Sequence, residues 1–157
     1  MYNDNDINLY EQVIEKSREL FPHRYFLTTK FKNWELMDQL GKEMHQVALT
    51  DVRILARYSK SHIYPLIGCN YDRRRNAHYH TILLSENELN FDALNKFDDG
   101  RYMDIQKYDG RRHCLVYTTR KHIPFYQREV VHPRMNRGEC RNNRCIHSRA
   151  LQGYIPR

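Results

Sequence analysis

The chain has 157 residues, which is enough for one domain that buries its own core. Hydrophobic residues make up 40% of it and aromatic residues 12%, a composition that excludes an intrinsically disordered chain. No apolar run reaches the roughly 18–20 residues of a spanning helix, and the first residues, MYNDNDINLYEQ, are polar and acidic. We therefore expect no membrane segment and no secretory signal.

The charge balance favours a polyanionic partner. Lysine and arginine total 26 against 19 acidic residues, so the net charge is +7. Arginines stand beside histidines in YDRRRNAHYH and DGRRHC, a setting suited to phosphate binding. Without an export signal, the four cysteines are expected to be reduced thiols; they are Cys69, Cys114, Cys140 and Cys145.

The first part of the chain predicts a helix, a strand and a second helix. Apolar residues recur at helical spacing over residues 7–20, and Pro22 follows. The segment RYFLTTKF, residues 24–31, is rich in aromatic and β-branched residues and is typical of a strand. A second amphipathic helix is predicted from residue 33 or 34 to about residue 47.

Two further strands are predicted next. The segment HIYPLIGCNYD, residues 62–72, contains Pro65, which indicates an edge strand or a bulge. The segment HYHTILLS, residues 78–85, gives the clearest strand pattern in the chain. Only RRRN separates the two segments, so they are expected to pair as antiparallel neighbours.

The following region predicts a helix, a strand and another helix. Residues 86–97 look helical, with Ser85 and Glu88 at the spacing of a capping box. Residues 101–108 form a strand candidate, and residues 111–122 a helix.

With the first helix set aside, this order predicts an α+β fold with a central antiparallel sheet and helices packed on one face, a ferredoxin-like sandwich. We expect an N-terminal helix within residues 1–22, a main domain over residues 23–128 and a loosely structured basic tail over residues 129–157.

Two histidines with one residue between them form a candidate metal site. Side chains alternate along a strand, so His78 and His80 should project to the same side about 6.5–7 Å apart, where they could converge on one divalent ion. Tyr79 should point the other way. As third ligand we favour Gln106, which falls on the strand face opposite the apolar Met103. The other candidates for third ligand are Asp72 and His113.

Three segments together resemble the motifs of the HUH endonucleases. These enzymes include the rolling-circle nickases of plasmids and viruses, conjugative relaxases and Y1 transposases. RYFLTTKF resembles the first motif, an apolar strand ending in threonine, and HYH resembles the His, bulky residue, His motif. VYTTRKH resembles the third motif, a tyrosine on a helix followed by a basic residue. The resemblance spans residues 24–122.

The resemblance implies a metal-dependent endonuclease that nicks and joins single-stranded DNA through a covalent 5′ phosphotyrosine. Tyr117 would be the nucleophile, with Arg120 or Lys121 as its basic partner, and Mn²⁺ or Mg²⁺ would be held by the histidines. Replication initiators usually carry lysine three residues after the tyrosine, whereas here that position is Arg120, which leaves the choice between the two open. The alternative nucleophiles are Tyr126, Tyr108 and Tyr102.

Further contacts are expected outside the metal site. The predicted DNA-binding residues are Thr28, Thr29, Lys30, Arg73, Arg74 and Arg75. In the tail, a small Zn²⁺ site is a second hypothesis, the alternative being an arginine-rich arm that follows phosphates; its ligands would be Cys140, Cys145, His147 and His132.

The sequence therefore predicts an HUH replication initiator of a bacterial plasmid or phage, acting in the cytoplasm on single-stranded origin or hairpin DNA. A host helicase is a candidate partner, because the chain has no phosphate loop of its own. A Y1 transposase or relaxase would use the same chemistry. A non-catalytic single-stranded nucleic-acid-binding module is the alternative from another class.

Overall fold

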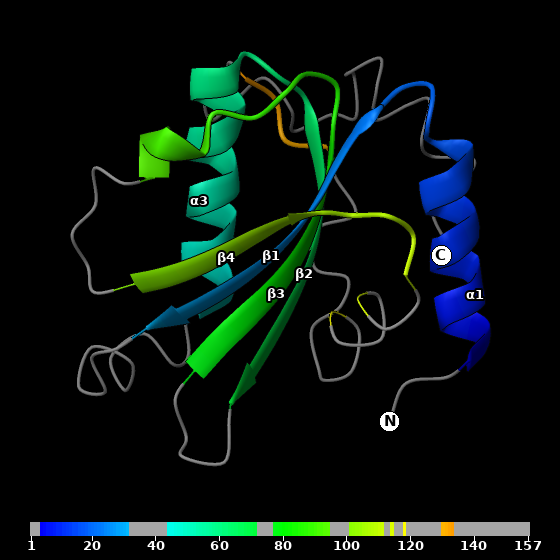
Figure 1. The fold of residues 1–157 in the computed structure, drawn as a ribbon, viewed down its shortest axis with the longest axis horizontal. Helices are drawn as coiled ribbons and strands as arrows, with labels where there is room; N and C mark the ends of the chain where they lie inside the picture. Colours follow the sequence, from blue (N-terminus) through cyan, green and yellow to red (C-terminus); the bar gives the residue numbers. More distant parts are fainter. Residues whose placement is uncertain are drawn as a thin grey trace.

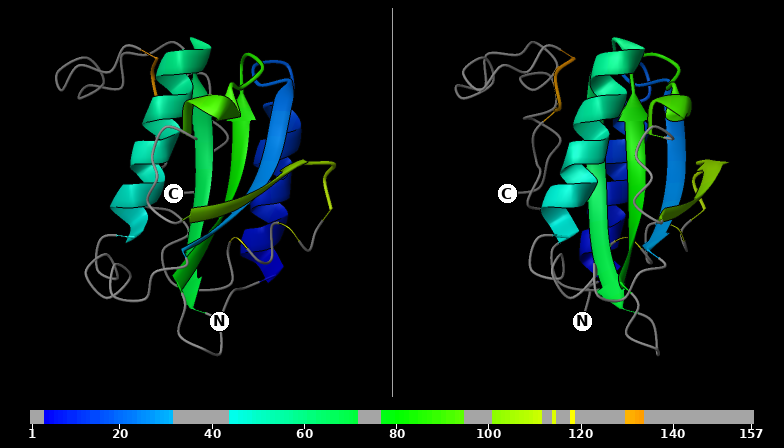
Figure 2. Two further views of the ribbon diagram at one scale, coloured as in Figure 1. Left: turned by 60° about the vertical axis from the view of Figure 1, so that its left-hand side comes forward. Right: turned by 90° about the vertical axis from the view of Figure 1, so that its left-hand side faces the viewer.

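The computed structural model describes residues 4–31, 44–71, 77–94, 101–111, 114, 118 and 130–133. Over these residues the protein has an α+β fold, in which one antiparallel sheet of four strands lies between two helices (Figures 1 and 2). The predicted fold class is confirmed. Neither helix in this part of the chain is long and apolar enough to cross a membrane.

The sheet has the strand order β2-β3-β1-β4. The strands are β1 (His23–Phe31), β2 (Ile63–Tyr71), β3 (Ala77–Ser85) and β4 (Arg101–Lys107). All neighbouring strands pair antiparallel, so the predicted pairing of β2 with β3 is confirmed. Pro65 lies in β2, an edge strand of the sheet, where a residue without an N–H can be tolerated.

Helix α1 (Asp4–Lys16) covers one face of the sheet. Its apolar side chains pack against even-numbered strand residues such as Phe26 and Ile82. The helix ends at Lys16, not at residue 20 as the periodicity predicted, because Ser17 begins a turn and its hydroxyl donates to the Ile14 carbonyl oxygen over 3.1 Å.

Helix α3 (Met44–Ser59) covers the opposite face of the sheet. There it packs against odd-numbered strand residues such as Leu27 and Leu83. The prediction of helices on one face set the first helix aside, and α1 lies on the opposite face of the sheet from α3. The predicted helix over residues 33–47 is confirmed at residues 44–47, where the structure describes it, but its predicted end near residue 47 is wrong, because the helix continues to Ser59. Its buried residues follow helical spacing: Ala48, Leu49, Val52, Leu55 and Ala56.

The region after β3 departs from the predicted helix over residues 86–97. Residues 86–90 are not helical, and only a short 3-10 helix, η1 (Phe91–Leu94), follows. Ser85 does not cap a helix: it ends β3, and its hydroxyl lies 2.7 Å from the Ser61 hydroxyl and donates to the Asn87 carbonyl oxygen over 2.6 Å. The side chain is thus used to join the ends of two strands.

Residues 130–133 belong to the packed domain, so the predicted start of a loose tail at residue 129 is wrong for this segment. Val131 forms an isolated antiparallel bridge with Ile63 through two backbone hydrogen bonds of 3.0 and 2.7 Å. Val130 and Val131 are each 2% exposed. The segment, orange in Figure 1, extends the edge of the sheet beside the beginning of β2.

Candidate metal and nucleic-acid site

The histidine pair lies on the sheet face that α1 partly covers. In the strand register, His80 is opposite Gly68 on one side and Thr28 on the other, and Thr28 is in turn opposite Asp104. Directly paired residues point to the same face of a sheet, so these four positions form one row across all four strands. His78 lies in the next row, opposite Lys30.

Thr28 and Phe26 fix the orientation of the His80 ring. Thr28 Oγ1 lies 3.1 Å from His80 Nδ1, and the Phe26 ring stacks on the imidazole with centroids 5.7 Å apart and planes inclined by 3°. The ring centroids of His78 and His80 are 5.0 Å apart, and their planes are inclined by 79°. The two imidazoles therefore share one face at close range, and a metal ion on His80 Nε2 would leave the bond to Thr28 intact.

The surroundings of His80 favour its neutral form. Burial, followed by the charges of His78 and Lys30, lowers the pKa of His80 from 6.5 to about 4. Because only the neutral imidazole has a lone pair to donate, His80 is able to coordinate a metal at neutral pH. The close spacing of the two rings and the neutral form of His80 are thus compatible with binding of a divalent transition metal.

The predicted third ligand, Gln106, lies on the same face but in another row. It is opposite Phe26, it is exposed, and its Nε2 donates to Asp104 Oδ2 over 2.9 Å. Asp104 is the residue in the His80 row. Within the described ranges, no group of three or more histidine, cysteine, aspartate or glutamate side chains is arranged to hold a metal ion.

Gly68 brings a distant part of the chain onto the histidine face. A Cβ atom added to Gly68 would lie 1.7 Å from the Thr118 carbonyl oxygen, so the Thr118 backbone rests directly on Gly68. Thr118 and Cys114 are helical, and the Thr118 hydroxyl donates to the Cys114 carbonyl oxygen over 2.9 Å. The region of the third motif therefore reaches the strand position that pairs with His80.

Two of the alternative nucleophiles can be compared directly. Tyr108 is 5% exposed; burial, followed by the charges of Cys114 and Glu11, raises its pKa to about 12, which disfavours the phenolate. Tyr102 is 56% exposed and lies opposite Lys30, on the histidine face. The structure does not describe Tyr117, Tyr126 or the basic partners Arg120 and Lys121.

The predicted DNA contacts divide between the two faces of β1. Thr28 and Lys30 lie on the histidine face, where Lys30 is exposed. Thr29 points to the opposite face and is fully buried, so its prediction as a DNA contact is wrong; strand alternation is the reason. Residues 73–75, with the alternative ligands Asp72 and His113, lie outside the described residues.

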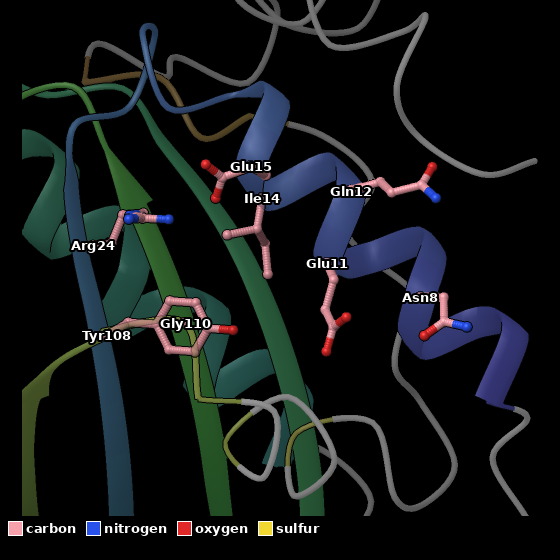
Figure 3. A pocket seen from close by; sticks show the side chains of 8 residues that line it. All are labelled: Asn8, Glu11, Gln12, Ile14, Glu15, Arg24, Tyr108 and Gly110. Carbon is pink, nitrogen blue, oxygen red and sulfur yellow. The ribbon is translucent and has the colours of Figure 1, made fainter.

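A cavity of about 540 Å³ opens between α1 and the sheet (Figure 3). Glu11 and Glu15 project into it from α1, facing Arg24 and Tyr108 from the sheet side. Two carboxylates would repel a phosphate group, so this cavity is a poor site for the DNA backbone. It also lies near the opposite end of β1 from Thr28, because Arg24 pairs with Leu84.

The predicted Zn²⁺ set in the tail is described only at His132. Its Nε2 lies 2.9 Å from Nε2 of His62, and the two ring centroids are 4.2 Å apart. His132 is thus attached to the domain through a histidine that the prediction did not include. Cys140, Cys145 and His147 lie outside the described residues, and Cys114 is buried.

Comparison with protein-family models, curated proteins and solved structures gives no match for this chain. Sequence reasoning overlooked Gly68, although a glycine inside a strand is a recognised signal of close backbone approach. It also overlooked Phe26 as the ring that stacks on His80, because an apolar residue in a strand normally indicates core packing.

Proposed function

We propose that this protein is a metal-dependent, single-stranded DNA endonuclease of the HUH type, which nicks and rejoins DNA through a covalent tyrosine intermediate. The observation that carries the proposal is the row across the sheet in which Gly68 stands beside His80 while the Thr118 backbone lies on Gly68. Tyr117 is covalently joined to Thr118. Tyr117 is therefore the residue that we favour as the nucleophile.

The metal would be held by His78 and His80, whose rings share one face and of which His80 favours the neutral form. When bound, Mn²⁺ or Mg²⁺ supplies Lewis-acid polarisation of a non-bridging phosphate oxygen. Thr28 holds the His80 ring in place, and Lys30, exposed beside His78, adds positive charge for the DNA backbone. Asp104 and Gln106 are the nearest polar groups of β4 for completing the ligand set.

The chemistry is a transesterification. The phenol oxygen of Tyr117 bonds to phosphorus, the bond between phosphorus and the 3′ oxygen breaks, and the proton released by the phenol passes to the new 3′ hydroxyl. Arg120 or Lys121 would favour the phenolate by its charge. Because the phosphotyrosine retains the bond energy, the 3′ hydroxyl of the same or another strand can reverse the reaction and rejoin the DNA.

The biological setting that fits this chemistry is initiation of rolling-circle replication of a plasmid or phage in the bacterial cytoplasm. The net charge of +7 supports a nucleic-acid partner. Single-stranded origin or hairpin DNA would be the substrate, with a host helicase as partner. A Y1 transposase or relaxase would share the covalent step.

The proposal is tested by incubating the protein with Mn²⁺ and a pool of single-stranded oligonucleotides, followed by denaturing electrophoresis. A denaturation-resistant adduct is expected with the wild-type protein and not with Tyr117→Phe. Tyr102→Phe is the matched control, because Tyr102 is an exposed phenol on the same face. The double variant His78→Ala, His80→Ala should form no adduct while it keeps much of its DNA affinity.

An adduct that persists in Tyr117→Phe but disappears in Tyr102→Phe would show that Tyr102 of β4 is the nucleophile. No adduct with any divalent metal or sequence pool, together with salt-dependent DNA binding, would favour a non-catalytic nucleic-acid-binding module.

A further inference from the structure

A second pair of histidines lies at the other end of the sheet. His62 precedes β2, Glu86 follows β3, and His132 belongs to the segment that bridges to Ile63. Five residues of β3 lie between His80 and Glu86, so the two residues are six steps apart, roughly 20 Å along an extended strand. This cluster is therefore separate from the site assigned to nicking.

We propose that His62 and His132 form a binding site for a late first-row divalent transition metal, such as Ni²⁺ or Zn²⁺, with Glu86 orienting His62. The inference goes beyond the proposed endonuclease function and does not depend on it. It rests on three features of the cluster: the separation of the two nitrogens, the inclination of the two rings and the carboxylate behind one of them.

The distance between the two Nε2 atoms matches a metal-binding pair. They are 2.9 Å apart. Two imidazoles bound to one ion at about 2.0–2.1 Å in adjacent positions, at about 90°, would hold their nitrogens about 2.9 Å apart. Opening the pair to about 3.4 Å would suit tetrahedral Zn²⁺.

The ring orientation favours convergence on a shared point over a straight hydrogen bond. A linear N–H···N bond of this length would place the ring centroids about 5 Å apart, because each nitrogen lies roughly 1 Å from the centre of its ring. The centroids of His62 and His132 are instead 4.2 Å apart, with planes inclined by 78°. The lone-pair axes of the two nitrogens are thus not collinear, as binding of both nitrogens to one ion requires.

Glu86 prepares His62 for this role. Its Oε2 lies 2.8 Å from His62 Nδ1, so that Nδ1 donates its proton to the carboxylate and Nε2 carries the lone pair in the neutral ring. A carboxylate behind a metal-binding histidine fixes the tautomer and raises its basicity. The side chains of His62 and Glu86 are 16% and 33% exposed, so an ion can reach them from solvent.

A bound ion would fasten residues 130–133 to the ends of β2 and β3. Binding would stabilise the folded chain, because the two histidines come from segments 70 residues apart in sequence and meet only when the domain is folded.

The test uses the full chain carrying His78→Ala and His80→Ala, so that the first histidine pair does not contribute. Isothermal titration with NiCl₂, repeated with ZnSO₄, should give one bound ion per chain and a higher melting temperature. Adding His62→Ala or His132→Ala should remove that ion and the thermal shift. Adding His23→Ala, an exposed histidine at the start of β1, should change neither.

Glu86→Gln keeps the size of the side chain, so this variant should fold even if the histidine variants do not. It should weaken the affinity for Ni²⁺ about 10- to 100-fold while leaving the melting temperature of the metal-free protein nearly unchanged. No saturable Ni²⁺ or Zn²⁺ binding in the starting variant would overturn the proposal and leave a hydrogen-bonded histidine pair. An ion that survives His62→Ala but is lost with Cys140→Ser and Cys145→Ser would also overturn it, because His62 is not part of the tail set.

Discussion

Thr28 and His80 are cross-strand neighbours at the centre of the sheet, and the Thr28 hydroxyl oxygen lies 3.1 Å from His80 Nδ1. The second threonine of the same motif, Thr29, is buried on the opposite face. The two threonines of RYFLTTKF therefore have separate roles: Thr28 positions an imidazole, and Thr29 belongs to the interior.

Thr28→Val should reduce the affinity of the protein for Mn²⁺ by about 10- to 100-fold, since valine has the same shape but cannot hydrogen-bond to the His80 ring. Thr28→Ser, which keeps the hydroxyl, should retain most of the affinity. Mn²⁺ titrations monitored by electron paramagnetic resonance measure the affinities of both variants. Equal affinities in the two variants would show that the hydroxyl does not position the ring.

Gly68→Ala should destabilise the protein by at least about 2–3 kcal/mol, because its new Cβ would collide with the Thr118 carbonyl oxygen. The adduct yield should fall with it. Gly110→Ala is the matched control: Gly110 has φ +86° but no heavy atom within 4 Å of an added Cβ, so only backbone strain of about 1 kcal/mol is expected. Urea unfolding compares the two. A larger loss in Gly110→Ala would contradict the close approach at Gly68.

Tyr79→Phe should cost about 1–3 kcal/mol of stability without changing metal affinity. The Tyr79 hydroxyl donates to Asp51 on α3, and both side chains are buried. Since Tyr79 points away from His78 and His80, its loss should weaken the attachment of α3 to β3 alone. A double-mutant cycle with Asp51→Asn gives the coupling energy by denaturant unfolding. A coupling near zero would mean that the contact does not stabilise the fold.

The free energy of unfolding should fall as the pH rises from about 10 to 12, partly because of Tyr108. Its folded pKa of about 12 lies above the ordinary value of 10.0, so the folded chain retains the phenol proton that the unfolded chain has lost. This stabilisation is fully present below pH 10 and is lost by pH 12, by up to about 2–3 kcal/mol. Tyr108→Phe should flatten the profile over this range, and an unchanged slope would contradict the assignment.

A chain ending at Pro133 should be more stable than one ending at Glu129 by about 3–5 kcal/mol. Val130 and Val131 are buried, and Val131 makes two backbone hydrogen bonds to Ile63. Thermal and urea unfolding of the two truncated chains measure the difference directly. Equal stabilities would show that residues 130–133 do not stabilise the domain and belong to the tail.

The strands could be predicted because each carries its own local pattern. All four strands begin and end within one residue of their predicted bounds. The helices were less predictable, since apolar spacing alone did not fix where one helical segment ends: the residues from Ala48 to Ala56 continue the helical spacing past the predicted end. Which sheet face each helix covers depends on tertiary packing, which periodicity does not encode.

The candidate site was predictable only where it depends on alternation. The shared face of His78 and His80 follows from strand geometry, and the same rule excludes Thr29. The contacts that the site makes with distant segments do not follow from geometry within one strand. The contact of Thr118 with Gly68 joins positions 50 residues apart, and the meeting of His62 with His132 depends on a bridge made by Val131.

The strands that carry the histidines are divided along their length. Toward one end of β1 and β3 lie the buried Phe26, Ile82 and Leu84, and toward the other lie the more accessible His78 and Lys30. The buried apolar end of these strands therefore contributes most of their folding free energy. Under the proposed function, substitutions at the accessible end would alter metal preference or DNA sequence preference while the domain still folds, so this scaffold would allow its specificity to diverge.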